Sequence, residues 1–111
     1  VYNGTSLPSV FAPTLLPLAS SWTHVVLTWS STNGLRLYVN NVLVASRPSA
    51  TTFAATAVTT NYVTLGNALS ASGSCAAGSI GVLGPYRGAV DDFRIYSREL
   101  TVDDVCVLYS S

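Results

Sequence analysis

Few residues of this chain could carry catalytic chemistry. His24 is the only histidine, which excludes a zinc site built from several histidines and leaves a Ser-His-Asp triad one candidate base. His24 lies in a segment of alternating hydrophobicity, on the side opposite Val25 and Leu27. We therefore expect a structural histidine that forms hydrogen bonds across a sheet, and catalysis by this residue is the alternative.

The carboxylates do not form an acid–base pair. Glycosidases need two carboxylates on either side of the bond that they cleave. Glu99 is the only glutamate and falls in an expected turn, whereas Asp91 and Asp92 are adjacent and would point to different sides of a strand. The sequence therefore predicts that the chain is not an enzyme.

Asp91 and Asp92 are also the candidate calcium ligands. Calcium takes a cluster of oxygen ligands, and a β-bulge at this point could bring both carboxylates toward one rim of a sheet. In the alternative interpretation, either aspartate pairs with a nearby arginine, namely Arg87, Arg94 or Arg98. We commit to no metal or other cofactor, and keep calcium as the hypothesis to test.

Two features are typical of a secreted protein. Cys75 and Cys106 are the only cysteines, and an even count in a charge-poor chain rich in Ser and Thr favours one disulfide formed in an oxidising compartment. Such a bond would close a loop of about 30 residues, and two buried free thiols are the alternative. Asn3 begins the one Asn-Gly-Thr sequon, which predicts N-glycosylation of a surface loop if a eukaryote secretes the protein.

Aromatic residues offer a second kind of binding chemistry. Tyr38 and Tyr96 fall on the polar faces of their expected strands, whereas Trp29 aligns with the apolar face and is expected in the core. Exposed tyrosine rings can stack on sugar rings. Tyr38 and Tyr96 are therefore candidates for sugar stacking, and packing against an adjacent domain is the alternative.

The composition excludes several classes of partner. Hydrophobic residues make up 49% of the 111 residues and charged residues 9%, with a formal net charge of zero. Nucleic-acid binding rests on clustered cations, and disorder needs low hydrophobicity with high net charge. A membrane span needs roughly 20 apolar residues in succession, far more than any run in this chain. The low charge indicates a surface that is largely covered by protein or sugar.

Strands must position these residues, because hydrophobicity alternates with a period of two along most of the chain. The pattern predicts a strand over 22–29, a turn over 30–34 and a hairpin over 35–46. Asn40 and Asn41 suit a two-residue type I′ loop, which would pair Val39 with Val42 and Leu37 with Val44. The alternating apolar residues of these strands, from Val25 to Val44, would then form the core face.

Further elements are expected toward the C-terminus. Strands are predicted over 62–65 and 88–96, the second with a bulge near Asp91 and Asp92. Thr101 and Asp104 have the spacing of a capping box, which predicts a helix of at most two turns with Val102, Val105 and Tyr109 on one face.

Four sequence motifs occur in an order that resembles laminin G-like domains, members of the concanavalin A-like lectin/glucanase jelly-roll superfamily. They are WTHVVLTW at 22–29, LRLYVNNVLVA at 35–45, VTLGN at 63–67 and YRGAVDDFRIYSRELT at 86–101. The resemblance implies an all-β fold, an antiparallel β-sandwich with one short C-terminal helix. It also supports the disulfide, because many such domains have a bridge near their C-terminus.

The motifs belong to the C-terminal half to two-thirds of that fold. We therefore expect an extended, proline-containing lead-in over 1–21, and a sandwich segment over 22–111 that is part of a larger polypeptide or assembly. The resemblance implies a non-catalytic interaction or structural module outside the cell or at its surface. Its partners would be other domains or subunits in adhesion or in a filament. The alternative is a lectin-like module that binds glycans, with or without calcium.

Overall fold

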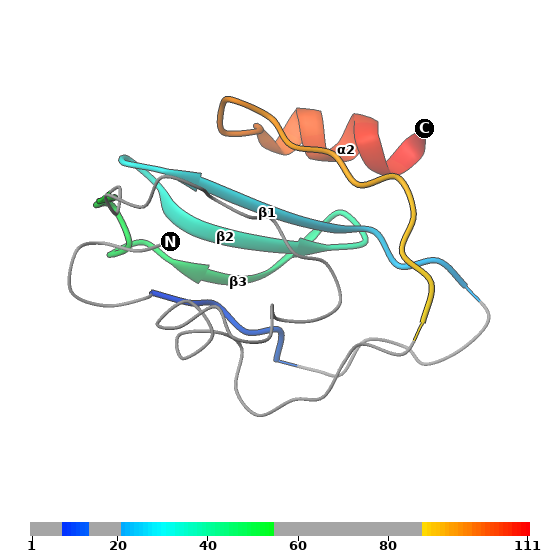
Figure 1. The fold of residues 1–111 in the computed structure, drawn as a ribbon, viewed down its shortest axis with the longest axis horizontal. Helices are drawn as coiled ribbons and strands as arrows, with labels where there is room; N and C mark the ends of the chain where they lie inside the picture. The colour runs from blue at the N-terminus through cyan, green and yellow to red at the C-terminus, as the bar shows by residue number, and fades with distance from the viewer. Residues whose placement is uncertain (1–7, 14–20, 55–87) are drawn as a thin grey trace, which may run out of the picture. The chain divides into compact units, whose positions relative to one another are not determined.

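The computed structural model describes residues 8–13, 21–54 and 88–111 (Figure 1). The chain divides into two compact units, one formed by residues 1–55 and 96–111 and the other by residues 56–95. The first unit contains strands β1 (Val25–Ser30), β2 (Gly34–Val39) and β3 (Val42–Arg47), and helix α2 (Val102–Ser110). No helix in the described part of the chain is long and apolar enough to cross a membrane.

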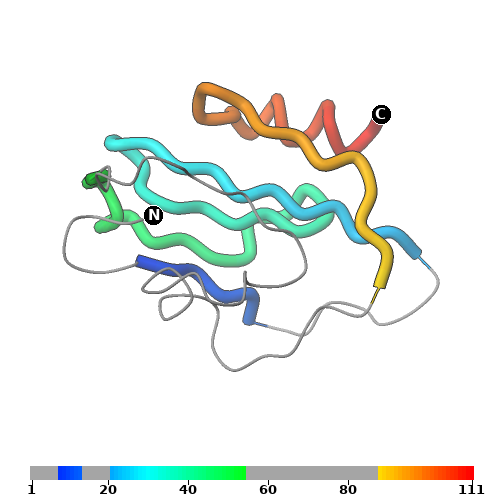
Figure 2. The backbone as a smooth tube through the Cα atoms, in the orientation of Figure 1, coloured from blue at the N-terminus to red at the C-terminus, as the bar shows by residue number. Residues whose placement is uncertain are grey.

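The three strands form an antiparallel sheet in the order β1-β2-β3, as Figure 2 shows in outline. Val25 pairs with Val39, Leu27 pairs with Leu37, and these aliphatic side chains share one face of the sheet. The alternation expected from the sequence is therefore present. Gly34 begins β2 with φ of 68°, and a Cβ at this position would collide with the carbonyl oxygen of Arg47.

The loop between β2 and β3 has the expected two residues. Asn40 and Asn41 have φ of 48° and 64°, as a type I′ turn requires, and Val39 pairs with Val42. The expected pair of Leu37 with Val44 is wrong, because Leu37 pairs with Ala45. A register shift next to Tyr38 leaves one extra residue in β3, which is a β-bulge.

Helix α2 begins with the expected capping box. The Thr101 hydroxyl accepts a hydrogen bond from the Asp104 backbone N–H at 3.1 Å, and the Asp104 carboxylate accepts one from the Thr101 N–H at 2.8 Å. The helix has nine residues, about two and a half turns, and is slightly longer than expected. The helix places Val102, Val105 and Tyr109 on one face, as expected, but only Val105 is fully buried, and 57% of Val102 and 49% of Tyr109 are exposed.

One face of the sheet carries α2. Tyr38 of β2 forms a buried cluster with Leu100 and Val105, and Val26 of β1 and Leu108 of α2 pack against it. Figure 1 shows α2 on one side of the strands. The side chains of this cluster lie on the face that the sequence had indicated as polar, because β1 and β2 alternate and Val26 pairs with Tyr38.

The opposite face, expected to be the core, is covered at one end. Leu35 is 2% exposed and Ala50 is 2% exposed. The Trp29 indole N–H donates a 2.6 Å hydrogen bond to the Ala50 carbonyl, and its ring lies 6.0 Å from that of Phe53. The other end of this face is open, since Leu27 and Val42 are each 60% exposed. The described residues therefore cover only part of the face that the sequence predicts to be the core.

Residues 88–96 do not form the expected strand. A strand exists through hydrogen bonds to a neighbouring strand, and no described segment pairs with these residues. Asp92 has a positive φ of 51°, but a β-bulge needs two paired strands, so the described residues do not form the bulge that was expected here. The other expected strand, over 62–65, lies outside the described residues.

Candidate functional site

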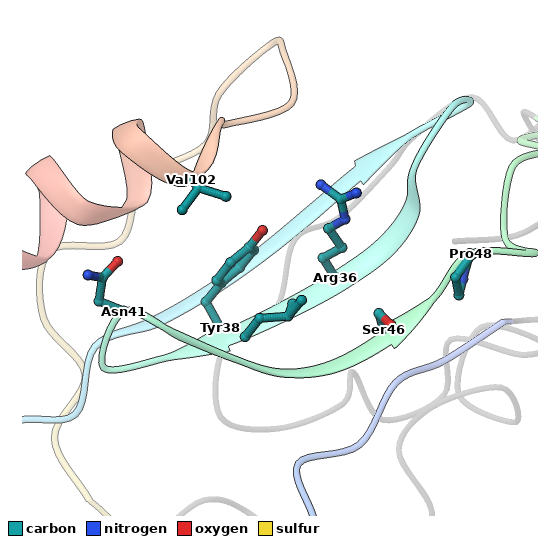
Figure 3. A pocket seen from close by; sticks show the side chains of 7 residues that line it. Arg36, Tyr38, Asn41, Ser46, Pro48 and Val102 are labelled. Carbon is teal, nitrogen blue, oxygen red and sulfur yellow. The ribbon is translucent and has the colours of Figure 1, made fainter.

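A groove opens on the α2 side of the sheet, between the β2–β3 hairpin and the start of α2. Its volume is about 410 Å³, within the range of ligand sites. It is lined by Arg36, Tyr38, Asn41, Leu43, Ser46, Pro48 and Val102. Figure 3 shows the Arg36 and Tyr38 side chains on the same side of β2, with Val102 facing them from α2.

Arg36 brings the charge to this groove. Its Nη2 donates a 2.9 Å hydrogen bond to the side-chain oxygen (Oδ1) of Asn33, and its Nη1 lies 3.9 Å from the Glu99 carboxylate. The side-chain amide of Asn33 in turn donates a 2.9 Å hydrogen bond to the Glu99 carboxylate. This hydrogen bond is the main cause that lowers the Glu99 pKa, and Arg36 makes a smaller contribution. The three residues therefore connect the β1–β2 turn to the segment before α2 and hold the guanidinium in place.

Arg36, Asn41 and Ser46 were not among the site residues predicted from the sequence. The signal that points to Arg36 is its place two residues before Tyr38, on the same face of one strand. Ser46 pairs with Arg36 across the strands, but this pairing depends on the bulge in β3, which the hydrophobic pattern did not reveal.

The structure does not place both candidate tyrosines at the surface. Tyr38 is 3% exposed because Leu100 and Val105 cover its ring, so the interpretation of Tyr38 as an exposed stacking residue is wrong. Tyr96 is 41% exposed and borders a separate hollow of about 230 Å³ beside α2. Only one of the two rings, that of Tyr96, therefore presents a face to a ligand.

Asp91 and Asp92 lie on the exposed segment before residue 96. Asp92 forms a 2.7 Å ion pair with the Nε atom of Arg94, one of the arginine partners considered above. The Asp91 carboxylate accepts a 2.8 Å hydrogen bond from the Asp92 N–H. Within residues 8–13, 21–54 and 88–111, no group of three His, Cys, Asp or Glu side chains could hold a metal ion. Calcium binding by this pair stays a prediction.

Arg98 pairs with Asp104 rather than with Asp91 or Asp92. Two hydrogen bonds, of 2.6 and 3.0 Å, join its guanidinium to the Asp104 carboxylate. This bidentate contact is the largest cause that holds the pKa of Asp104 well below its usual range, and Thr101 adds to it. The same contact raises the pKa of Arg98. The pair ties the segment before α2 to the first turn of the helix.

His24 lies just before β1 and has a structural environment. Its backbone N–H donates to the Asn40 side-chain oxygen at 3.0 Å, and its carbonyl accepts from the Asn40 N–H at 2.9 Å. Its ring lies 5.8 Å from that of Tyr109. The hydrogen bonds come from the backbone rather than from the imidazole, whose buried Nδ1 atom has no partner among the described residues.

Two predicted modification sites involve residues that the structure does not describe. Asn3 and Cys75 both lie outside the described residues, so N-glycosylation and the disulfide stay predictions. Cys106, the other cysteine of the expected bridge, is exposed on α2.

Comparison with known proteins identifies the family. The sequence matches a laminin G-type family model, described as the concanavalin A-like lectin/glucanases superfamily, over residues 1–106. Because the match covers nearly all of the chain, the chain belongs to this family. The resemblance found in the four motifs and the expected fold class, an antiparallel jelly-roll sandwich with a short C-terminal helix, are thereby confirmed.

Relatives of known name include a receptor from two mammals. Adhesion G-protein coupled receptor D1 of Homo sapiens and that of Bos taurus are each 30% identical to this chain over 95 residues. The alignments cover 86% of this chain but 10% and 9% of the receptors, so the chain spans about a tenth of these relatives.

A solved structure is similar in fold. An S-layer domain-containing protein from Clostridium thermocellum superposes with a TM-score of 0.60 at 24% identity. The superposition covers 88% of this chain and 43% of that chain. At this identity the similarity supports the fold alone.

Proposed function

We propose that the chain is part of an extracellular, non-catalytic module that packs against other protein domains in adhesion or in a surface assembly. The observation that carries this proposal is the open end of the sheet face formed by Val25, Leu27 and Val42. These aliphatic side chains are 50%, 60% and 60% exposed, and the half-buried Val39 of β2 lies between Val25 and Val42 on the same face. Contiguous exposed apolar surface is typical of a protein interface.

The relatives support the same location and role. Both curated relatives are adhesion receptors, 30% identical to this chain over 95 residues, and adhesion takes place at the cell surface. A chain with 9% charged residues has few groups with which to keep a large surface in water. We infer that a neighbouring domain or subunit covers the open end.

The proposed absence of catalysis has its own support. The His24 ring lies against Tyr109, and the Glu99 carboxylate is engaged by Asn33 and Arg36. The Ser30 hydroxyl also contributes to lowering the Glu99 pKa, so structural contacts engage both side chains that could act as an acid or a base.

Sugar binding is the second candidate function, and Tyr96 is the observation that favours it. This ring is 41% exposed and borders a hollow that also contains the polar side chains of Arg98 and Asp103. A glycan array probed with and without a chelator tests this candidate. Binding that Tyr96→Ala abolishes would support it, and absence of binding to any glycan would exclude it.

Sedimentation velocity tests the main proposal. We expect the chain to associate as its concentration rises, because association removes the open sheet face from water. The double substitution Leu27→Asp with Val42→Asp should leave a folded monomer, since charged side chains oppose burial of this face. Ser31→Asp with Thr32→Asp adds the same charge in an exposed turn and should leave association unchanged. A chain that stays monomeric at all concentrations, or a control that also abolishes association, contradicts the proposal.

A further inference from the structure

The groove beside α2 is a second, distinct surface of the same unit. Its walls come from β2, from β3 and the turn after it, from the hairpin loop and from the first residue of α2. We propose that this groove binds a short segment of a partner protein in which an apolar side chain lies next to a carboxylate. The inference rests on the proposed function as an interaction module and names the chemistry of one partner.

Charge complementarity is the reason to expect a carboxylate in the groove. Arg36 is the one charged residue among the described residues that line the groove, and no acidic side chain lines it. Within the described residues the guanidinium donates one hydrogen bond, to Asn33, and its contact with Glu99 is a long 3.9 Å ion pair. Its remaining donors are available to an incoming carboxylate, which arginine binds through paired N–H groups.

The apolar residues that line the groove indicate which kind of partner side chain lies next to the carboxylate. Leu43 and Val102 are 49% and 57% exposed and line the groove together with Pro48, which is also exposed. An aliphatic side chain placed between them would remove apolar surface on both sides from water. The partner therefore combines an aliphatic side chain with an acid.

Two further observations favour a peptide over a sugar. The Tyr38 ring at the base of the groove is 3% exposed, so it offers no ring face for stacking. The side-chain amide oxygen (Oδ1) of Asn41 is a buried acceptor without a hydrogen-bond partner among the described residues. A backbone N–H of a bound segment would satisfy this acceptor, which otherwise carries a desolvation cost.

Nuclear magnetic resonance titration of the 111-residue chain tests the proposal with defined probes. The probe is the capped tripeptide acetyl-Leu-Glu-Leu-amide, and its matched control has Gln in place of Glu. We expect the Glu peptide to shift the amide signals of Arg36, Leu43 and Val102 and to bind about tenfold more tightly than the Gln peptide, because a charge-assisted hydrogen bond is lost in the control.

Variants that preserve the fold check the charge argument in both directions. Val102→Asp places an acid at the helix N-terminus, where it suits the helix dipole, and should weaken binding of the Glu peptide about tenfold. Ser46→Lys adds a cation to the groove and should tighten binding several-fold. Ser31→Lys adds the same charge in the β1–β2 turn and should leave binding unchanged.

Three outcomes would overturn the proposal. Equal binding of the two peptides would show that the groove does not recognise a carboxylate. Absence of binding at millimolar peptide would show that the groove is not a peptide-binding site. If lactose binds and shifts the same amide signals, the ligand of the groove is a sugar rather than a peptide. None of these outcomes alters the expected association through Leu27 and Val42, so failure of the groove and failure of the proposed function are distinguishable.

Discussion

The two faces of the β1–β3 sheet differ in what covers them. On one face, α2 and the segment before it bury Tyr38, and Thr28 on the same face is 3% exposed. On the other face, the aliphatic side chains of Leu27 and Val42 are more than half exposed. The more polar face is thus the better covered, which shows that alternation decides which residues share a face but not which face finds a partner.

The open end of the sheet exposes apolar surface, and burial of this surface would favour association. Burying a Val or Leu side chain completely contributes roughly 1.5–3 kcal/mol relative to leaving it exposed. Leu27 and Val42 retain more than half of their accessible surface and therefore much of this contribution. A covering sheet or subunit would gain it on binding, less the cost of ordering the partner.

The largest effect is expected for a charge on the covered face. Val105→Asp places a carboxylate at a fully buried position and should lower the free energy of unfolding by about 3 kcal/mol or more. Val107→Asp is the matched control in the same helix, at a side chain that is 66% exposed, and should cost less than about 1 kcal/mol. Urea unfolding followed by tryptophan fluorescence measures both. Equal costs would show that α2 does not pack on the sheet.

Local signals in the sequence predicted the parts of the fold that neighbouring residues determine. The type I′ loop follows from two asparagines that tolerate positive φ, and the start of α2 follows from the spacing of Thr101 and Asp104. The bulge that pairs Leu37 with Ala45 leaves no mark in an alternating pattern, so the register of β3 was not predictable beyond Leu43.

Long-range contacts explain what the sequence did not predict about the candidate site. Tyr38 was expected at the surface because it alternates with Leu37 and Val39, and its burial depends on α2, more than 60 residues further along the chain. The groove likewise needs Arg36 and Val102 to meet across this distance. Hydrophobic periodicity describes one element at a time and contains no information about such packing.

Substitutions in the hairpin loop should have a smaller effect on stability, one that comes from backbone conformation rather than from side-chain packing. Asn41→Ala should cost about 1 kcal/mol, because a Cβ without a compensating polar group disfavours the left-handed φ of 64°. Asn41→Gly should change stability by less than about 0.5 kcal/mol, since glycine adopts this conformation freely. Thermal unfolding of both variants checks the prediction. An alanine variant as stable as the wild type would contradict the type I′ geometry.

The ion pair at the start of α2 predicts a pH dependence on the covered side of the sheet. In the unfolded chain an Asp titrates near pH 3.9, about its ordinary value, and Arg98 lowers the folded-state pKa of Asp104 below it. The ionised form thus favours the folded state, so this stabilisation is complete above about pH 5 and is lost as the pH falls toward the folded-state value.

Asp104→Asn removes this titration. Its stability deficit relative to the wild type should shrink steadily as the pH is lowered from about 5 toward 2, and salt should also reduce it because the pair is at the surface. Asp103→Asn, an exposed acid in the same helical turn, is the control and should show no comparable trend. A deficit that is independent of pH would show that Arg98 does not hold Asp104 in solution.

Adjacent residues of β1 offer the most direct test of the difference between the two faces. Val26 packs against the buried cluster under α2, and Leu27, on the other face, is 60% exposed. At a protein concentration low enough to keep the chain monomeric, Val26→Asp should lower the free energy of unfolding by about 2 kcal/mol or more, and Leu27→Asp by less than about 1 kcal/mol. A Leu27→Asp variant destabilised as much as Val26→Asp would contradict the open face.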